Sequence, residues 1–188
     1  IPNHDAAVAY GVRVAYSADM LIIGGGGGGE SYGGAGAGGY RTSTQTLSPG
    51  TIYTVAVGAG GTSAGYGADS QISGASLTTI TSTGGSRGSN NAAVGGYGSG
   101  GNAAGGAGGG GTGGKDGSGD TAGTINTGGG AGGSGTNIAP FVFGGSGVVI
   151  LSVPDISYSG ITTGFPTVAR GVSGKTIITF TGSGTYSG

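Results

Sequence analysis

The glycine-rich stretch at residues 95–135 most constrains how this chain can fold. More than half of its residues are glycine, and it contains no Leu, Met, Phe or Trp. Glycine costs about 1 kcal/mol per residue relative to alanine inside a helix, and a strand of glycine has no side chains to pack. The stretch is therefore either a flexible linker or a segment that folds through close backbone approach and free choice of φ.

The apolar segments on either side of this stretch favour folding. Residues 20–23 and 147–153 are short, almost continuously apolar, and typical of strands buried on both faces. Neither flank could bury a core alone, so we expect the two strands to share one fold with the glycine-rich body looped out between them. Polar interruptions at 89–91 and 115–116 divide this body into runs that suit polyproline-II-type rods, which have three residues per turn.

Several other segments predict strands. Residues 41–47 alternate and 51–57 are rich in β-branched residues, and the Ser48-Pro49-Gly50 turn between them suits type II, so we predict a hairpin over 41–57. Further strands are expected at 6–16 (with a bulge at Gly11), at 70–72, 75–83 and 176–181. No segment has helical periodicity. We therefore predict an all-β fold of short antiparallel strands and packed polyglycine-II-like rods, with essentially no α-helix.

Composition limits the functions that this chain can have. Charged residues make up 7% of the chain and the net charge is −1, which gives no electrostatic case for binding nucleic acid or an anionic membrane. There is no cysteine, so there is no disulfide and no thiolate chemistry. Ordering 54 glycines loses much backbone entropy, which main-chain hydrogen bonds or assembly with other chains must offset.

Two glycine patterns resemble nucleotide-binding motifs by chance. Gly24, Gly26 and Gly29 satisfy GxGxxG, but the residues that follow cannot form the helix that a dinucleotide site needs. Residues 109–116 nearly match a phosphate-binding loop, but Asp116 stands where Ser or Thr is required. We therefore expect no cofactor.

Metal binding and catalysis are also not expected. Asp116, Ser118 and Asp120 have the oxygen spacing of a calcium loop, but Thr121 replaces the required glycine and the distal Glu is missing, which favours a polar turn. His4 is the only histidine, and no carboxylate pair is placed for acid–base chemistry. The sequence predicts no catalytic residue, no metal site and no enzyme activity.

Four strings in the chain carry a family resemblance: LIIGGGGGG (21–29), GAGAGGYRTSTQTLSPGTIYTVAVGAGG (36–61), GADS (67–70) and GGSGVVILSVP (144–154). They resemble a glycine-rich domain family that is common in bacteriophage tail-fibre and virion proteins. The chain is similar, more distantly, to phage tail-fibre-tip adhesins built from packed polyglycine-II helices. The resemblance covers roughly residues 18–154. It implies a role in a virion or an extracellular fibre, without catalysis.

The chain departs from that family at its C-terminus. Members usually open with a Thr/Ser-rich strand before the LIIGGGG strand, whereas the matching string here, TIITFTGSGTYS, occupies 176–187. We therefore divide the chain into a glycine-rich domain (1–154), a Ser/Gly/Thr tether (155–174) and a C-terminal strand (175–188). This strand either begins a further repeat or is donated to the next subunit. The candidate assembly residues are Thr176, Ile177, Ile178, Thr179 and Phe180.

The expected function is that of a structural subunit of a phage tail fibre or extracellular filament. We expect a homo-oligomer or homopolymer without membrane insertion, with other virion proteins or a host surface receptor as further candidate partners. One alternative is an adhesin that contacts a host surface receptor, because aromatic side chains dominate interaction hot spots. Its candidate contacts are Tyr66, Asn90, Asn91, Tyr97, Phe141 and Phe143, although the two phenylalanines could instead cap the core. A second alternative is an ice-binding protein, which would need a Thr-lined face that residues 84–135 do not provide.

Overall fold

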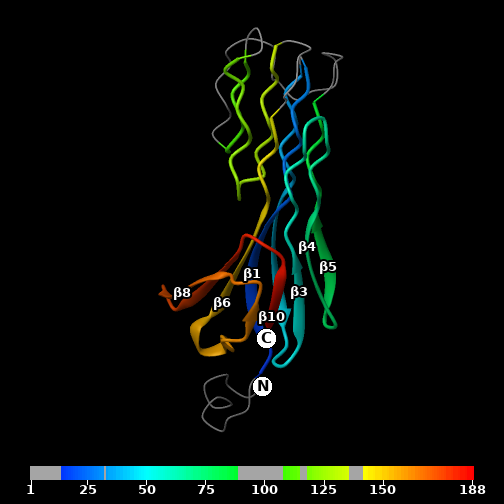
Figure 1. The fold of residues 1–188 in the computed structure, drawn as a ribbon. Coiled ribbons are helices and arrows are strands. Elements are labelled where there is room, and N and C mark those ends of the chain that lie inside the picture. Colours follow the sequence, from blue (N-terminus) through cyan, green and yellow to red (C-terminus); the bar gives the residue numbers. More distant parts are fainter. Residues whose placement is uncertain (1–13, 32, 89–107, 115–117, 136–141) are drawn as a thin grey trace.

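The protein is a β-sandwich with a glycine-rich extension (Figure 1). The computed structural model describes residues 14–31, 33–88, 108–114, 118–135 and 142–188. Two antiparallel five-stranded sheets have the orders β2-β1-β6-β9-β8 and β5-β4-β3-β10-β7. Among the described residues the only helical element is a 3₁₀ turn, η1 (Asp155–Ser157). The all-β prediction is confirmed. The strands are β1 (Tyr16–Ile23), β2 (Tyr40–Leu47), β3 (Ile52–Ala56), β4 (Ser70–Gly74), β5 (Leu77–Ser82), β6 (Val148–Pro154), β7 (Thr162–Thr163), β8 (Thr167–Val172), β9 (Lys175–Phe180) and β10 (Gly184–Ser187).

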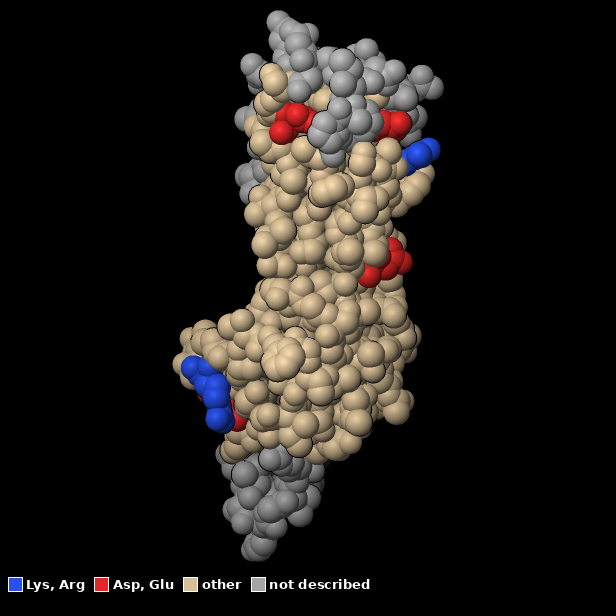
Figure 2. All heavy atoms as spheres, viewed as in Figure 1, with Lys and Arg blue, Asp and Glu red and all other residues tan. Residues whose placement is uncertain are grey.

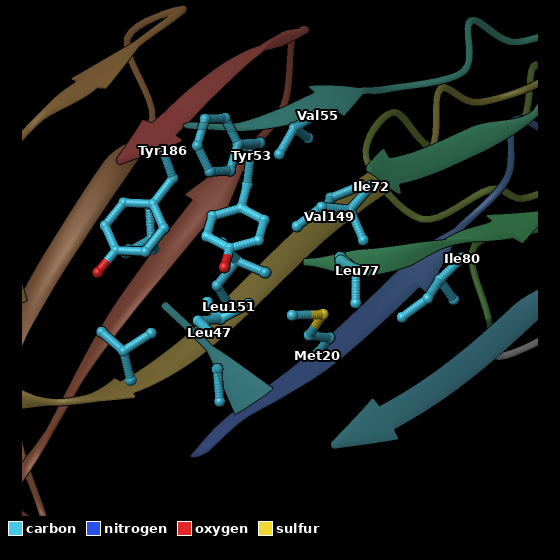
Figure 3. Close-up of a cluster of buried hydrophobic side chains, with 14 of the residues drawn as sticks. Met20, Leu47, Tyr53, Val55, Ile72, Leu77, Ile80, Val149, Leu151 and Tyr186 are labelled. Atoms are coloured by element: carbon cyan, nitrogen blue, oxygen red, sulfur yellow. The ribbon is translucent and has the colours of Figure 1, made fainter. Parts of the chain in front are cut away.

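The hydrophobic core lies between the two sheets (Figure 3). Alternation along β1 turns Tyr16, Ala18, Met20 and Ile22 inward, and they are buried. Both sheets contribute large side chains that are almost completely buried, each worth about 1.5–3 kcal/mol of burial free energy. They include Leu47, Tyr53, Val55, Ile72, Val149, Leu151, Val153, Ile178, Phe180 and Tyr186.

The two apolar strands that flank the glycine-rich region pair directly with each other. In β1 and β6, Met20 lies opposite Leu151 and Ile22 opposite Val149, as expected from their shared need for a core. The prediction that residues 20–23 are buried on both faces is wrong. Leu21 and Ile23 are only half-buried, because they point to the outer face of the sheet.

The predicted hairpin over 41–57 is also wrong, although both of its strands exist. β2 pairs with β1, whereas β3 pairs with β4 and β10 in the other sheet. Leu47 and Tyr53 both reach the core from opposite layers, so the chain must cross between the sheets here. The turn itself is as expected: Thr51 N donates to Ser48 O (3.2 Å), and Gly50 has φ +74°. The weaker strands expected near 70–72 and 75–83 are β4 and β5, which form a hairpin.

The C-terminal segment corrects the predicted domain division. β9 lies between β6 and β8, and β10 lies between β3 and β7, all within one chain. Residues 155–174 are not a tether, because they contain η1, β7 and β8. The physical reason is burial: Ile178, Phe180 and Tyr186 are fully buried in the chain's own core. In this structure the strand therefore completes the sandwich of its own chain.

The sandwich has two distinct ends. Both ends of the described chain lie near the β2–β3 turn: Tyr16 pairs with Leu47, and Gly188 N donates to Thr51 O (2.9 Å). We call this end the base. The described parts of 24–39, 58–69, 83–88, 108–135 and 142–147 extend from the opposite end of the strands, as Figure 1 shows, and we call them the glycine body.

A buried tyrosine pair links the two sheets. Tyr16 and Tyr186 hydroxyl oxygens are 2.7 Å apart, and Tyr186 stacks on Tyr158 with ring centroids 6.2 Å apart. Burial raises the pKa of Tyr186 above its ordinary value, and the hydrogen bond with Tyr16 opposes this shift. The neutral phenol is therefore the form that suits the folded state.

This pair predicts a loss of stability at high pH. Unfolded Tyr186 ionises near pH 10, and the folded form ionises only at higher pH. Its contribution is therefore complete below about pH 10 and is lost as the pH rises through the folded pKa. We expect the urea midpoint measured at about pH 11 to be lower than the one measured at about pH 8. This difference should be smaller in Tyr186→Phe. Tyr40→Phe, at an exposed site, is the control; an unchanged pH response in Tyr186→Phe would contradict this account.

Candidate functional site

The glycine body is organised around residues 24–29, which we call the central run. Its N–H groups donate in three directions, with a repeat of three residues. Gly24 and Gly27 donate to the carbonyls of Gly39 and Gly36, at 3.0 and 2.9 Å. In the second direction, Gly25 and Gly28 donate to the carbonyls of Ala68 and Gly65, at 2.9 and 2.8 Å. In the third direction, Gly26 and Gly29 donate to the carbonyls of Gly145 and Val142, both at 2.9 Å. In each direction the two acceptor residues are also three positions apart in the sequence.

The carbonyl groups of the central run accept in three further directions. Gly25 and Gly28 accept from the N–H groups of Gly85 and Gly88 (2.8 and 2.9 Å). Residues 26 and 29 accept from Gly61 and Ala64, and residue 27 accepts from Ala131, at 2.7–3.0 Å. Six other stretches of backbone therefore hydrogen-bond with this one run, which satisfies polar groups that burial would otherwise leave unpaired.

This arrangement explains why the central run consists of glycine alone. A Cβ at Gly27 would lie 2.0 Å from Ser86 O, and a Cβ at Gly28 would lie 1.7 Å from Thr62 O. The other four positions meet backbone carbonyl oxygens at 2.0–2.3 Å. Real side chains do not fit at such distances. Close approach, rather than an unusual φ, is what these six residues require.

The same hydrogen bonds exclude the two nucleotide-binding interpretations. The N–H groups of Gly24, Gly26 and Gly29 already donate to protein carbonyls, so they cannot cradle a pyrophosphate. In the second motif, Gly111 N donates to Gly130 O and Gly114 N to Gly133 O, both at 2.8 Å. Backbone pairing therefore uses two of the donors that a phosphate would need.

The calcium-like spacing at 116–120 is only partly described by the structure. Asp116 lies outside the described residues, and no group of three or more His, Cys, Asp or Glu side chains meets among the residues that are described. Asp120 Oδ2 is buried without a hydrogen-bond partner. The nearby Thr112 and Thr121 hydroxyl oxygens pair with each other at 2.8 Å, as in a polar turn.

Two of the predicted receptor contacts lie exposed on the glycine body. Tyr66 is 68% exposed, on a stretch that bonds to the central run, and Arg87 Cζ lies 5.6 Å from its ring centroid. Phe143 is 57% exposed, next to Val142 and Gly144, so it does not cap the core. The remaining candidates, Asn90, Asn91, Tyr97 and Phe141, lie outside the described residues.

The predicted assembly residues lie inside the sandwich. In β9, Thr176, Ile178 and Phe180 are fully buried, while Ile177 and Thr179 are half-buried on the outer face. Thr176 Oγ1 donates to Asp155 Oδ1 at 2.6 Å, and this bond is the main cause that lowers the pKa of Asp155. These five side chains hold their own chain together.

Sequence reasoning missed the turn between β7 and β8. Phe165 is fully exposed and has φ +52°, between Gly164 (φ +79°) and Pro166. A bulky residue in this conformation is uncommon, and such outliers cluster at functional sites. Its sequence signal was the Gly-Phe-Pro string, because Gly and Pro mark turns.

The outer surface of the molecule is rich in hydroxyl groups and poor in charge. On the second sheet, Thr163, Thr185, Thr54 and Ser73 occupy one cross-strand row, and the first two hydroxyls are 2.8 Å apart. Figure 2 shows that most of the visible surface carries no charged side chain. The ice-binding alternative would have to use this row on the sandwich rather than residues 84–135.

Comparisons with protein-family models, with curated proteins and with solved structures find no match. Within the described residues, no helix is long and apolar enough to span a membrane.

Proposed function

We propose that this protein is a structural subunit of a phage tail fibre or extracellular filament, acting without catalysis. In this proposal the β-sandwich supports the glycine body, which is a stiff bundle of polyglycine-II-like rods. The observation that carries the proposal is the hydrogen bonding of the central run. Its three-residue repeat matches the three residues per turn of such rods, and its six bonded neighbours suit a rod packed on all sides.

The physical role of such a bundle is to extend rigidly with little side-chain chemistry. Backbone hydrogen bonds between rods offset the entropy that 54 glycines lose on ordering. Few charges and a hydroxyl-rich surface keep the extension inert toward charged polymers. A virion or extracellular location fits this role.

Assembly of the purified full chain tests the proposal. We expect sedimentation and electron microscopy to find oligomers or filaments that carry regularly spaced projections. The projections belong to the glycine bodies, so the Gly28→Ala variant should lose them while the sandwich remains folded. A chain that stays monomeric at every concentration would contradict the structural role.

A receptor-binding function is a second candidate, favoured by one observation. Both ends of the described chain lie at the base, so the described glycine body extends away from any attachment there. Tyr66, with Arg87 above its ring, presents an aromatic contact on this body. If the fibre binds cells, Tyr66→Ala should weaken binding of labelled protein to a panel of bacterial cells at least tenfold. The control is Tyr40→Ala, which removes a tyrosine of similar exposure at the start of β2; equal losses would argue against a Tyr66 contact.

A further inference from the structure

The outer face of the first sheet contains an open hollow of about 540 Å³ over β2, β1 and β6. Its side chains alternate along each strand with those that fill the core. Six outward-facing side chains line it in two cross-strand rows, Thr42-Leu21-Ile150 and Thr44-Asp19-Ser152. Because the core fixes the register of these strands, it also fixes how the six side chains lie relative to one another.

The second row contains a carboxylate that is held in place. Asp19 Oδ1 accepts a hydrogen bond from the Thr44 hydroxyl (2.7 Å), and Asp19 Oδ2 lies 3.7 Å from Lys175 Nζ. The Asp19 side chain is 58% exposed, so a ligand can reach it. An ionised carboxylate has about four lone-pair sites that accept hydrogen bonds. Asp19 can therefore accept further hydrogen bonds, and it loses little freedom in doing so.

The first row supplies a small apolar surface. Leu21 and Ile150 lie opposite each other on β1 and β6, and both are half-buried on the outer face. Thr42 lies beside Leu21, and Ser152 lies two residues along β6 from Ile150. The hollow therefore offers an apolar patch that is framed by hydroxyl groups and one carboxylate.

This combination limits the class of ligand. The formal charges of Asp19 and Lys175 cancel, so the hollow has no net charge that would favour an anion or a cation. A purely apolar ligand would cover Asp19 and the hydroxyl groups without giving them hydrogen bonds, which costs free energy. A neutral ligand that carries both hydroxyl groups and exposed C–H groups satisfies both parts of the surface.

We propose that the hollow binds a neutral saccharide. Sugar hydroxyls donate to Asp19 and exchange hydrogen bonds with Thr42 and Ser152, while the C–H face of a sugar ring packs on Leu21 and Ile150. The volume of the hollow lies in the usual range of small-molecule sites, about 300–1,000 Å³. Among the lining residues Asp19 is the only carboxylate, whereas glycoside hydrolysis uses two. The hollow therefore binds a saccharide without cleaving it.

This binding site goes beyond the proposed fibre function and does not depend on it. All of its lining residues belong to β1, β2 and β6, so a single sandwich contains the whole hollow. The glycine body contributes no residue to it.

Equilibrium dialysis of the full chain against radiolabelled hexasaccharides tests the site. The neutral probes are linear hexasaccharides of glucose, mannose, galactose and N-acetylglucosamine, and hexagalacturonic acid is the anionic comparison. We expect saturable binding of at least one neutral probe, and Asp19→Ala should weaken it at least tenfold. The matched control is Ser17→Ala, at an exposed position on the same face of β1 outside the hollow, which should change the affinity less than twofold.

A second pair of variants tests the apolar patch. Ile150→Thr should weaken binding at least fivefold, because it removes apolar surface from the hollow. Ile177→Thr, at a half-buried position on β9 outside the hollow, should change binding less than twofold. Near-ultraviolet circular dichroism should be the same for all four variants and the unaltered chain.

Every other outcome overturns a stated part of the proposal. The absence of saturable binding for all neutral probes would overturn the saccharide site. Equal losses in Asp19→Ala and Ser17→Ala, or in Ile150→Thr and Ile177→Thr, would overturn its place on the first sheet. Tighter binding of hexagalacturonic acid would overturn the neutral class. Dialysis does not depend on the state of assembly, so each failure leaves the fibre function standing, and a chain that remains monomeric leaves this site standing.

Discussion

Replacing Gly28 with alanine is expected to disrupt the glycine body more than any other single methyl group added to the chain. The new Cβ would lie 1.7 Å from Thr62 O, 2.7 Å from Thr62 C and 3.0 Å from Gly61 O, and all three atoms belong to backbone that cannot rotate away. Overpacking typically costs 1–3 kcal/mol, and pushing the neighbouring backbone away also breaks the hydrogen bonds of Gly28 with Gly65 and Gly88. We expect a loss of about 3 kcal/mol or more in the stability of the glycine body.

Two other glycines provide matched controls for this substitution. Nothing lies within 4 Å of a Cβ built at Gly108, in the glycine body, or at Gly182, between β9 and β10. Gly108→Ala and Gly182→Ala should change stability by no more than about 0.5 kcal/mol. Thermal unfolding and amide exchange of the three variants check the ranking. If Gly28→Ala behaves like the two controls, the close packing of the central run is wrong.

Replacing Phe180 with alanine is expected to destabilise the sandwich by about 3–5 kcal/mol, the usual cost of truncating a buried phenylalanine. Phe180 is fully buried and lies opposite Val149 of β6. Thr179→Ala, at the neighbouring half-buried position on the outer face, should cost less than about 1 kcal/mol. Urea unfolding of the two variants measures this difference.

The same experiment separates the two possible origins of β9. Within one chain, the loss caused by Phe180→Ala is independent of protein concentration. If β9 were donated by a neighbouring subunit, the unfolding midpoint would rise with protein concentration. A concentration-dependent midpoint, or equal losses for Phe180→Ala and Thr179→Ala, would contradict the topology described above.

Local composition was enough to predict most strands. Residues 147–153 are rich in Val, Ile and Leu, so a strand (β6) followed directly, and its pairing with β1 followed from the shared need for a core. Its predicted burial on both faces is wrong, because Ile150 and Ser152 on the outer face are only half-buried. The turn at Ser48-Pro49-Gly50 was also predictable, because Gly50 supplies the positive φ that type II requires.

Strand partners could not be predicted in the same way. Alternation in 41–47 predicts a strand and its inward face, but it does not say which neighbour shares the sheet, and the chain crosses between sheets at Gly50. The Thr/Ser-rich string at 176–187 looked detached because it is last in sequence. Its Ile178, Phe180 and Tyr186 side chains nevertheless complete the core between strands that come much earlier.

The glycine body was the least predictable part, because glycine has no side chain to reveal a buried face. Nothing in the letters of residues 24–29 indicates which carbonyl each N–H group meets. The three-residue repeat emerges only from the backbone positions of six separate stretches. Phe165 was overlooked for a related reason: it is a single residue in a turn, outside any periodic pattern.

The most direct test of the central claim is hydrogen–deuterium exchange of the full chain labelled with ¹⁵N-glycine, followed by NMR. The N–H groups of Gly24–Gly29 all donate to carbonyls of other stretches, and exchange requires these bonds to open. The account predicts that these six amides exchange far more slowly than glycine amides in exposed turns, such as that of Gly182 between β9 and β10. Exchange of the six at the rate of an unfolded chain would contradict a packed glycine body.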